Sequence, residues 1–385
     1  MKFVDEFRDP DKAQFLLTEI RALVGRIERC RSRPLSIMEV CGGHTHAIFR
    51  YGIETMLPEE IELVHGPGCP VCVLPMGRVD DCITIAQTPG TIFTTFGDAM
   101  RVPGSKQSLL QAKADGADVR MVYSPADALA LARKHPDKQV VFFGLGFETT
   151  MPSTALTVLR AEAERIDNFS LFCNHITIIP TVKAILDSPD FQIDGFLGPG
   201  HVSMVIGNTP YNFIADHYRR PIVVAGFEPL DILHSIWMVL KQLAEGRAEV
   251  ENQYSRIVPE HGNQVALDAI GKVFELREFF EWRGLGSIDH SGVRMRKEYA
   301  RYDAERKFKV LDAVIADPKA CQCGEVLKGV LKPWGCKVFG TDCTPETPMG
   351  ALMVSSEGAC AAYYRFGDLE KIHLKQVAAR APERA

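Results

Sequence analysis

Cysteines are the residues of this sequence best suited to chemistry, and a group of them lies near the C-terminus. Five of the eleven cysteines fall between residues 321 and 360. The four that stand closest in sequence are Cys321, Cys323, Cys336 and Cys343. Four thiolates hold a [4Fe–4S] cluster, and four also hold structural zinc. The spacing lacks the paired C-x2-C of zinc ribbons, so it favours the cluster, with zinc and buried thiols as alternatives. Cys360 stands in a small apolar run and is expected to be a packed thiol.

A second group combines a thiol with imidazoles. The segment Cys41–His46 reads CGGHTH, and it directly follows an apolar run. Two adjacent glycines allow a tight turn or the close approach of a ligand. One thiol and two imidazoles within six residues suit a transition metal. The alternative is a structural cysteine at a strand end beside solvated histidines.

A third group is a C-x-x-C pair, Cys69 and Cys72, within the segment Gly66–Cys72 (GPGCPVC). This spacing after a strand is typical of a dithiol that is oxidised to a disulfide. Half of a zinc site is the competing interpretation, although the sequence has no second C-x-x-C. The cysteines outside these groups, Cys30, Cys82 and Cys173, are expected to be buried hydrophobic residues.

Two polar sites follow predicted strands. Glu148 lies in the segment Gly144–Thr150 (GLGFETT), where it is a candidate proton carrier or hydrogen-bond acceptor, with helix capping as the alternative. The G-x-G in this segment is too weak a pattern to indicate phosphate binding. His201 follows Gly198-Pro199-Gly200, and a structural role is favoured for it.

Composition limits the class of protein that these residues serve. The chain has 385 residues, 46% of them hydrophobic, and a net charge of −5, so we expect a folded protein without a basic surface for nucleic acid. The charged N-terminus lacks the apolar core of a signal peptide, and no apolar run approaches the length of a membrane span. We therefore expect a cytoplasmic protein, in which clustered thiols indicate metal or redox chemistry.

Strands alternating with helices must position these groups. An amphipathic helix is expected over residues 10–32, and eight short apolar runs follow it. The predicted strands are Ser36–Val40, Glu62–His65, Thr91–Thr94, Val119–Tyr123, Val140–Phe143, Ser170–Cys173, Gly195–Leu197 and Pro221–Ala225. Such alternation predicts an α/β fold with mainly parallel sheets.

Two similar lobes are predicted from a repeated spacing. Cys41 and Gly66 are 25 residues apart, as are Cys173 and Gly198. We infer a duplication, with chance matching of Gly-Pro-Gly strings as the alternative. The expected division is an N-terminal helix (1–33), a first lobe (34–138), a second lobe (139–235) and a mostly helical, iron–sulfur-binding domain (236–385).

The motifs together carry a resemblance. They are Cys41–His46, Gly66–Cys72, Gly146–Thr150, Gly198–His201, the cysteines from Cys321 to Cys343, and Met353–Cys360 (MVSSEGAC). In this order, over residues 5–366, they resemble the HypD family of hydrogenase maturation proteins. The resemblance implies a cytoplasmic iron–sulfur protein with two α/β lobes and a third domain that holds a [4Fe–4S] cluster. It also implies a role in assembling the Fe(CN)2(CO) group of [NiFe]-hydrogenases.

The resemblance further implies partners and residue roles. The small chaperone HypC forms a complex that holds the iron, and HypE, supplied through HypF, delivers cyanide. Cys41 is then the iron ligand and His44 its neighbour, while Cys69 and Cys72 are a redox-active pair. The cluster ligands are Cys321, Cys323, Cys336 and Cys343. One departure is Leu352, where the family pattern leads us to expect cysteine; the remaining cysteines suffice for a cluster.

These roles suggest a relay of electrons from the cluster to the Cys69/Cys72 pair and on to the iron at Cys41, with Glu148 and the histidines handling protons or holding HypC. Release of cyanide from thiocyanate needs two electrons, which a dithiol supplies as it forms a disulfide. Two rival hypotheses are a scaffold that only holds iron and a free-standing iron–sulfur disulfide reductase.

Overall fold

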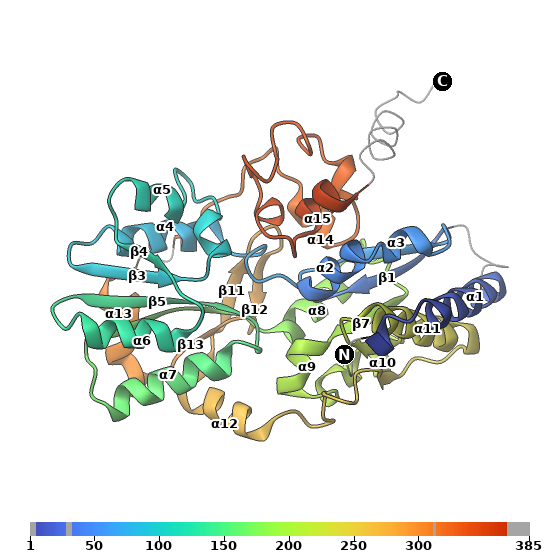
Figure 1. Cartoon of the computed structure of the whole chain (residues 1–385), viewed down its shortest axis with the longest axis horizontal. Helices are drawn as coiled ribbons and strands as arrows, with labels where there is room; N and C mark the ends of the chain where they lie inside the picture. Colours follow the sequence, from blue (N-terminus) through green and yellow to red (C-terminus); the bar gives the residue numbers. More distant parts are fainter. Residues whose placement is uncertain (1–4, 28–32, 311–312, 368–385) are drawn as a thin grey trace.

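Two parallel β-sheets organise the chain, and they lie at opposite sides of the molecule (Figure 1). The computed structural model describes residues 5–27, 33–310 and 313–367. Sheet A consists of β2 (Ile61–His65), β1 (Leu35–Glu39), β7 (Gly195–Pro199), β8 (Ile222–Ala225) and β9 (Val250–Asn252), in that spatial order. Sheet B consists of β4 (Val119–Met121), β3 (Thr91–Thr95), β5 (Gln139–Gly146) and β6 (Phe169–His175). All eight predicted strands are present.

Helices cover both sheets, which explains why the strands are almost entirely apolar. On sheet A, α1 (Pro10–Ile27) packs against α11 (Pro229–Glu245), and α11 packs on β7 and β8. On sheet B, α4 (Met76–Ala86), α6 (Pro125–Lys134) and α7 (Met151–Ala163) pack on β3, β5 and β6. The remaining helices of the two lobes are α2 (Gly42–Arg50), α3 (Ile53–Met56), α5 (Leu109–Ala114), α8 (Ile178–Leu186), α9 (Gly200–Ile206) and α10 (Asn212–Asp216).

The strand order confirms an α/β fold with two lobes and corrects their limits. The chain leaves sheet A after β2, builds all of sheet B, and returns to sheet A with β7. A boundary at residue 138 falls inside sheet B, and one at residue 235 falls inside α11. Hydrophobic patterning identifies strands but not their partners, because pairing depends on contacts between distant segments.

The topology also argues against duplication. Cys41 and Gly66 follow two strands of sheet A, whereas Cys173 lies in β6 of sheet B and Gly198 lies in β7 of sheet A. The two pairs of residues that are 25 positions apart therefore do not occupy equivalent places in the two sheets. The equal spacing arises because short glycine-containing turns recur at the ends of parallel strands.

The segment that follows α11 is less helical than expected. After α12 (Gln264–Val273) it forms two small antiparallel pairs, β10 with β13 and β11 with β12. Their strands are β10 (Phe274–Leu276), β11 (Phe279–Trp282), β12 (Gly286–Asp289) and β13 (Val293–Met295). A 3-10 helix (Lys297–Tyr302) and α13 (Ala304–Lys307) follow. Of the predicted N-terminal helix, residues 28–32 and with them Cys30 lie outside the described residues.

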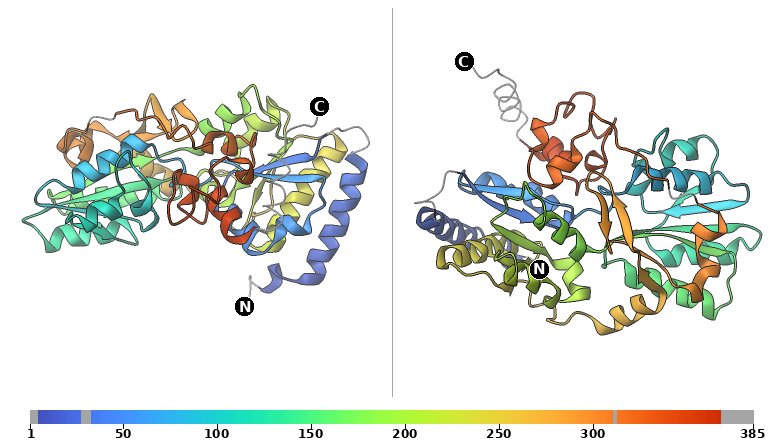
Figure 2. Two further views of the ribbon diagram at one scale, coloured as in Figure 1. Left: turned by 90° about the horizontal axis from the view of Figure 1, so that it is seen from above. Right: turned by 180° about the vertical axis from the view of Figure 1, so that it is seen from behind.

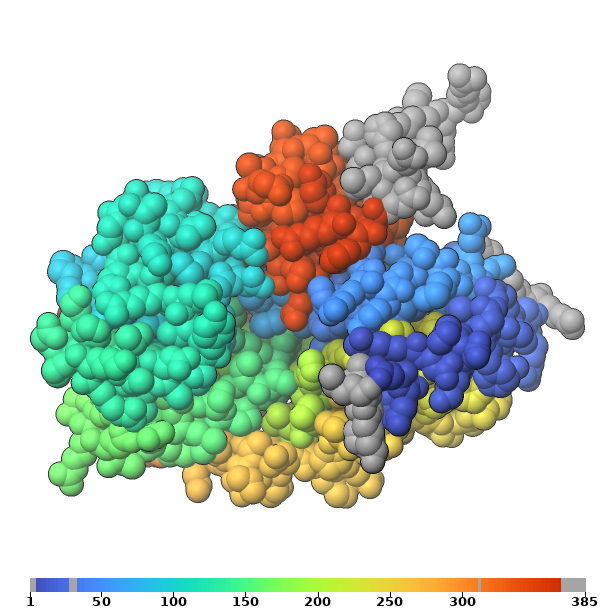
Figure 3. All heavy atoms as spheres, in the orientation of Figure 1, coloured from blue at the N-terminus to red at the C-terminus, as the bar shows by residue number. Residues whose placement is uncertain are grey.

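A C-terminal subdomain, residues 313–367, sits at the junction of the two lobes (Figures 2 and 3). Its helices are α14 (Cys323–Leu327) and α15 (Ala359–Phe366), and α15 packs on α2 of the sheet A lobe. Towards the other lobe, the Ser355 hydroxyl donates to Asp98 over 3.0 Å. Within the described ranges, no helix has the length and apolar character that a membrane crossing requires.

Candidate functional site

Cys41 is the N-cap residue of α2, and Val40 alone separates it from the end of β1. Helix N-termini present amide groups that stabilise negative charge, which is the usual setting of a reactive thiolate. The amide of His44 donates to the backbone carbonyl oxygen of Cys41 over 2.8 Å, which begins the helix. The thiol is buried, so its position suits a ligand that must be held away from bulk water.

A buried carboxylate fixes the Cys41 turn. Glu39, the last residue of β1, has no solvent exposure. Its two oxygens accept from the Cys41 amide over 2.8 Å and from His65 Nδ1 over 2.9 Å, and also from the hydroxyl of Thr45. Because β1 and β2 are parallel with Glu39 opposite His65, the acid and the imidazole meet at the carboxyl edge of sheet A.

Burial, followed by the charges of Glu39 and Glu357, raises the pKa of the Cys41 thiol well above its ordinary value. The amides of Gly43 and His44 oppose this shift. The thiol is therefore protonated at neutral pH when it is alone. A bound cation would compensate the thiolate charge and release the proton.

Two imidazoles stack on one phenyl ring. His44 and His201 both stack on Phe227, with ring centroids 4.6 Å and 3.8 Å from it. His44 Nε2 lies 3.1 Å from the carbonyl oxygen of Ala225, so Nε2 carries the proton, and Nδ1 is buried without a partner. Burial lowers the pKa of His44, which leaves its ring neutral. His44 lies in the first turn of the helix that begins after Cys41, and His201 stacks on the same phenyl ring as His44.

The C-x-x-C pair lies next to Cys41. Cys69 and Cys72 form a disulfide, with their Cα atoms 5.2 Å apart. The backbone of Gly68 is packed against that of Cys41 so closely that no side chain fits there. The amide of Gly42 donates to the Gly68 carbonyl oxygen over 3.0 Å. The turn that carries the candidate metal ligand thus packs directly on the turn that carries the redox-capable pair.

The segment Val354–Gly358 closes over this contact from the C-terminal subdomain. A Cβ on Gly42 would lie 2.6 Å from Glu357 Oε2, so the Glu357 side chain rests on the residue after Cys41. A Cβ on Gly358 would lie 3.0 Å from Cys72 Sγ. The segment therefore contacts both the residue that follows the candidate iron ligand and the disulfide.

Glu148 lies at the facing edge of sheet B. Its Oε1 accepts from the Ile178 amide over 3.1 Å, while Oε2 is buried without a partner. Burial raises the pKa of Glu148 to about 7, which suits a proton carrier. Tyr211 is fully buried nearby, and its hydroxyl lies 3.1 Å from Ser203 Oγ. Burial raises the pKa of Tyr211.

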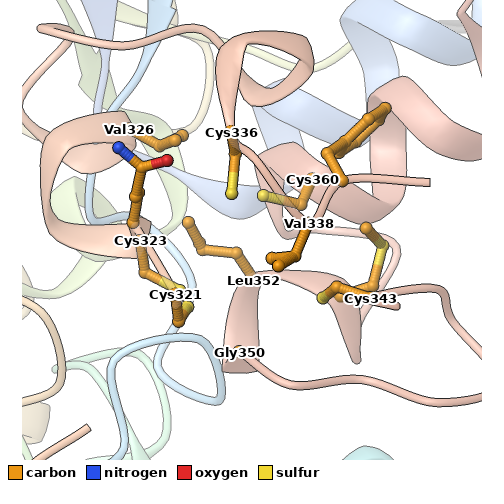
Figure 4. A pocket seen from close by; sticks show the side chains of 12 residues that line it. Cys321, Cys323, Val326, Cys336, Val338, Cys343, Gly350, Leu352 and Cys360 are labelled. Atoms are coloured by element: carbon orange, nitrogen blue, oxygen red, sulfur yellow. Dashed lines mark hydrogen bonds between the residues drawn. The ribbon is translucent and has the colours of Figure 1, made fainter. Parts of the chain in front are cut away.

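Five cysteines line one pocket in the C-terminal subdomain. They are Cys321, Cys323, Cys336, Cys343 and Cys360, and they surround Leu352 (Figure 4). The cavity itself is small, with a volume of about 20 Å³. Within residues 5–27, 33–310 and 313–367, no three His, Cys, Asp or Glu side chains are grouped to bind one metal ion. Cys360 shares the pocket, where a separately packed thiol was expected.

The pocket is built to accommodate sulfur. A Cβ on Gly350 would lie 2.5 Å from both Cys321 Sγ and Cys323 Sγ, so only glycine fits between the wall and the thiols. The Met349 amide donates to Cys343 Sγ over 3.4 Å. A hydrogen bond from Cys323 lowers the pKa of the Cys321 thiol. Four thiols with nearby amides are the donor type of an iron–sulfur cluster, although no three of the described side chains stand grouped around one metal position.

The structure thus gathers most of the predicted site residues into two neighbouring groups. The residues that sequence reasoning missed are Glu39, Glu357, Tyr211 and Cys360. An acid inside an otherwise apolar strand was a usable signal for Glu39, and Met353–Cys360 was already a recognised motif. Cys82 and Cys173 are buried, as predicted.

A two-lobed α/β fold that joins a helix-capping thiol to a C-x-x-C pair and a cysteine-lined pocket defines a protein whose chemistry rests on thiols. A family profile described as "HypD: Hydrogenase formation hypA family" matches residues 13–367. Over 371 residues the chain is 60% identical to a protein of Rhodobacter capsulatus named hydrogenase maturation factor HypD, covering 95% of this chain and 98% of that one. The chain therefore belongs to the HypD family of hydrogenase maturation factors.

Other relatives agree. The protein of the same name from Escherichia coli (strain K12) is 56% identical over 370 residues, covering 96% of this chain and 99% of that protein. The one from Rhizobium leguminosarum bv. viciae is 52% identical over 387 residues, covering 99% of each chain. The similarity spans both lobes and the C-terminal subdomain.

Proposed function

We propose that this protein, in the cytoplasm and together with HypC, scaffolds assembly of the Fe(CN)2(CO) group of [NiFe]-hydrogenases. In this proposal Cys41 holds the iron, and Cys69 and Cys72 supply electrons for transfer of cyanide from HypE. The observation that carries the proposal is the contact of Gly68 with Cys41, because it places the C-x-x-C pair beside the thiol.

Cys41 has the features of a ligand for an iron substrate. Its sulfur is buried at the N-terminus of α2, and a soft, electron-donating thiolate suits iron that carries cyanide and carbon monoxide. Burial raises the pKa of this thiol, and a bound cation would favour its thiolate form. Glu39 holds the Cys41 backbone in place during this exchange, since three donors already bind its carboxylate.

Cys69 and Cys72 supply the two electrons that cyanide release requires. In the thiocyanate carried by the donor protein, the S–C bond breaks. Cyanide leaves with the electron pair of that bond, and the donor's sulfur is reduced to a thiol. Cys69 and Cys72 lose two protons and two electrons and form the disulfide that the structure contains. One proton goes to the donor's thiol, and Glu148 or a histidine takes the other.

Cys321, Cys323, Cys336 and Cys343 would hold a [4Fe–4S] cluster, which supplies electrons one at a time when it is bound. Gly350 leaves room for the first two of these sulfurs, and the Met349 amide donates to the last. Leu352 lines the same pocket, and its carbonyl oxygen is in close contact with Gly358, the residue that abuts Cys72.

The test is anaerobic purification of the complex with HypC, followed by infrared spectroscopy and by iron and sulfide analysis. The wild type is expected to show CN and CO stretching bands. Cys41→Ser is expected to lose these bands and keep acid-labile sulfide. The matched control is Cys82→Ala, a buried cysteine in another core, which should retain both. Bands that persist in Cys41→Ser would refute the proposed ligand.

A second candidate function is an iron-holding scaffold in which the C-x-x-C pair is structural. The burial of Cys69 and Cys72 within the core of the junction favours it. Single serine variants separate the two functions, because a structural scaffold should still acquire cyanide.

A further inference from the structure

We propose that Arg283 and Asp317 form a charge pair that sets the reduction potential of the iron–sulfur cluster proposed for the cysteine-lined pocket. This inference rests on the proposed function of that pocket. Arg283 comes from the turn between β11 and β12, and Asp317 comes from the chain that leads into Cys321. Neither side chain is a ligand, so both are positioning residues that act through their charges.

The first support is the place of the turn that carries Arg283. An ideal Cβ on Gly284 would lie 2.9 Å from the Gly324 nitrogen and 3.5 Å from the carbonyl carbon of Cys323. In the other direction, a Cβ on Gly324 would overlap the Gly284 carbonyl oxygen. The turn therefore packs directly on the first two residues of α14, and Cys323 is one of the cysteines that line the pocket.

The two charged groups meet at this turn. Arg283 Nε lies 2.8 Å from Asp317 Oδ1, and Asp317 Oδ2 accepts from the Gly284 amide over 3.1 Å. Asp317 precedes the pocket cysteine Cys321 by only four residues. A hydrogen bond of 2.8 Å from the Cys321 amide to the Pro318 carbonyl oxygen folds this short connection back on itself. The charge pair thus lies where the turn, the start of α14 and the approach to Cys321 come together.

The second support is the isolation of the Arg283 charge from water. Its side chain is 1% exposed, whereas that of Asp317 is 29% exposed. Arg283 Nη1 donates to the Pro103 carbonyl oxygen over 3.1 Å, and Nη2 is buried without a hydrogen-bond partner among the described residues. Solvent weakens the charge of the acid more than that of the base, because buried charges are screened less. The pair therefore leaves a net positive potential on its buried side.

A positive potential of this kind favours reduction. One-electron reduction adds a negative charge inside the pocket, and no bond forms or breaks. The potentials of iron–sulfur clusters depend on nearby charge, on hydrogen bonds to sulfur and on exposure to solvent. The guanidinium stabilises the reduced form, and the carboxylate opposes it. The Arg283 amide also donates to the Val73 carbonyl oxygen over 2.8 Å, so the same turn contacts the residue that follows Cys72.

The test uses the full chain, purified anaerobically. Its readout is the midpoint potential, measured by titration with dithionite, which supplies the electron, and by electron paramagnetic resonance of the reduced protein. In Arg283→Gln we expect the equilibrium constant for one-electron reduction to fall at least tenfold, which lowers the midpoint by about 59 mV. Arg283→Lys keeps the charge and should recover most of this loss.

Removing the acid should have the opposite effect. Asp317→Asn can still accept from the Gly284 amide, and it leaves the Arg283 charge uncompensated, so the midpoint potential should rise. The matched control is Arg294→Gln in β13, which removes an arginine that is 58% exposed and should leave the midpoint unchanged.

The opposite signs separate an electrostatic role from a structural one. Loss of packing alone would shift Arg283→Gln and Asp317→Asn in the same direction, and that result would overturn the inference, as would wild-type potentials in both variants. If Arg283→Gln loses its acid-labile sulfide, the direction of the shift in Asp317→Asn decides. Wild-type protein without acid-labile sulfide would instead refute the proposed cluster itself, so the two failures are distinguishable.

Discussion

Gly68 lies against the backbone of Cys41, and the chain continues from Gly68 directly into Cys69. A hydrogen bond of 3.0 Å from the Gly42 amide to the Gly68 carbonyl oxygen ties the two turns together. Neither turn can move independently of the other. The distance between the candidate iron ligand and the disulfide is therefore set by backbone packing, which is more rigid than side-chain packing.

This contact predicts that Gly68→Ala is damaging. An added Cβ overlaps the backbone of Val40 and Cys41, so the two turns must separate. We expect a loss of about 1–3 kcal/mol in the free energy of unfolding, measured by urea denaturation, and loss of iron. Gly271→Ala in α12 is the control, because no atom lies within 4 Å of its added Cβ; it should stabilise the protein by up to about 1 kcal/mol. Equal effects of the two variants would contradict the packing argument.

Removing the charge of Glu39 should release the Cys41 turn. A glutamine there has one acceptor oxygen and an amino group that faces donors, so at least one of three hydrogen bonds is lost in a fully buried place. The free energy of unfolding of Glu39→Gln is expected to fall by about 2 kcal/mol. Glu59→Gln, at an exposed position, should leave it within about 0.5 kcal/mol of the wild-type value.

The C-x-x-C pair should be separable from iron binding. Cys69→Ser and Cys72→Ser are each expected to bind iron at Cys41 and to fail in repeated acquisition of cyanide, because one thiol cannot form the internal disulfide. Infrared spectra recorded after a second addition of cyanide donor provide the readout, with Cys82→Ala as the control. Normal CN bands in both serine variants would instead support the purely structural scaffold.

Gly350→Ala should prevent the cysteine-lined pocket from holding an iron–sulfur cluster. The added methyl group would lie 2.5 Å from both Cys321 Sγ and Cys323 Sγ, so these thiols cannot keep their positions. We expect acid-labile sulfide to fall severalfold in protein purified anaerobically. Gly25→Ala in α1, where the added Cβ meets nothing within 4 Å, should retain the wild-type content. Full sulfide content in Gly350→Ala would show that the pocket is not the cluster site.

The raised pKa of Glu148 predicts that the free energy of unfolding depends on pH. Burial raises its pKa from 4.5 to about 7, so the folded state keeps a proton that the unfolded state has released. The contribution of Glu148 to the free energy of unfolding is fully present below about pH 4.5. It falls as the pH rises towards 7 and is constant above that. The total change is about 3 kcal/mol. Glu148→Gln has no such proton, so the stability difference between wild type and variant, measured by denaturation from pH 4.5 to 8, should follow this curve.

Local features of the molecule were predictable from sequence, whereas the arrangement of distant segments was not. The strands around Val140–Phe143 and Pro221–Ala225 are apolar runs, and burial between helices requires that composition. The motif at Cys41 and the C-x-x-C pair were visible because short spacings bring their residues together in any fold.

The division of the strands between the two lobes could not be predicted. The residues of β3 do not determine that it pairs with β5 and not with β1. For the same reason, the closeness of Glu357 to Gly42 could not be read from the chain. Periodicity also failed for β10–β13, whose strands of three or four residues are too short to show alternation. The spacing of the cysteines predicted that four of them lie together but did not place Cys360 among them.

The chain builds all of sheet B before it completes sheet A, and this order has a consequence for biosynthesis. Cys41 emerges from the ribosome early, yet sheet A cannot be completed before β7, and Glu357 follows Cys41 by 316 residues. At the usual rate of translation, this interval is roughly 15 to 60 s. During that time the nascent thiol lacks the neighbours that bury it. The neighbours that bury the Cys41 thiol are therefore complete only after the last of these segments has been synthesised.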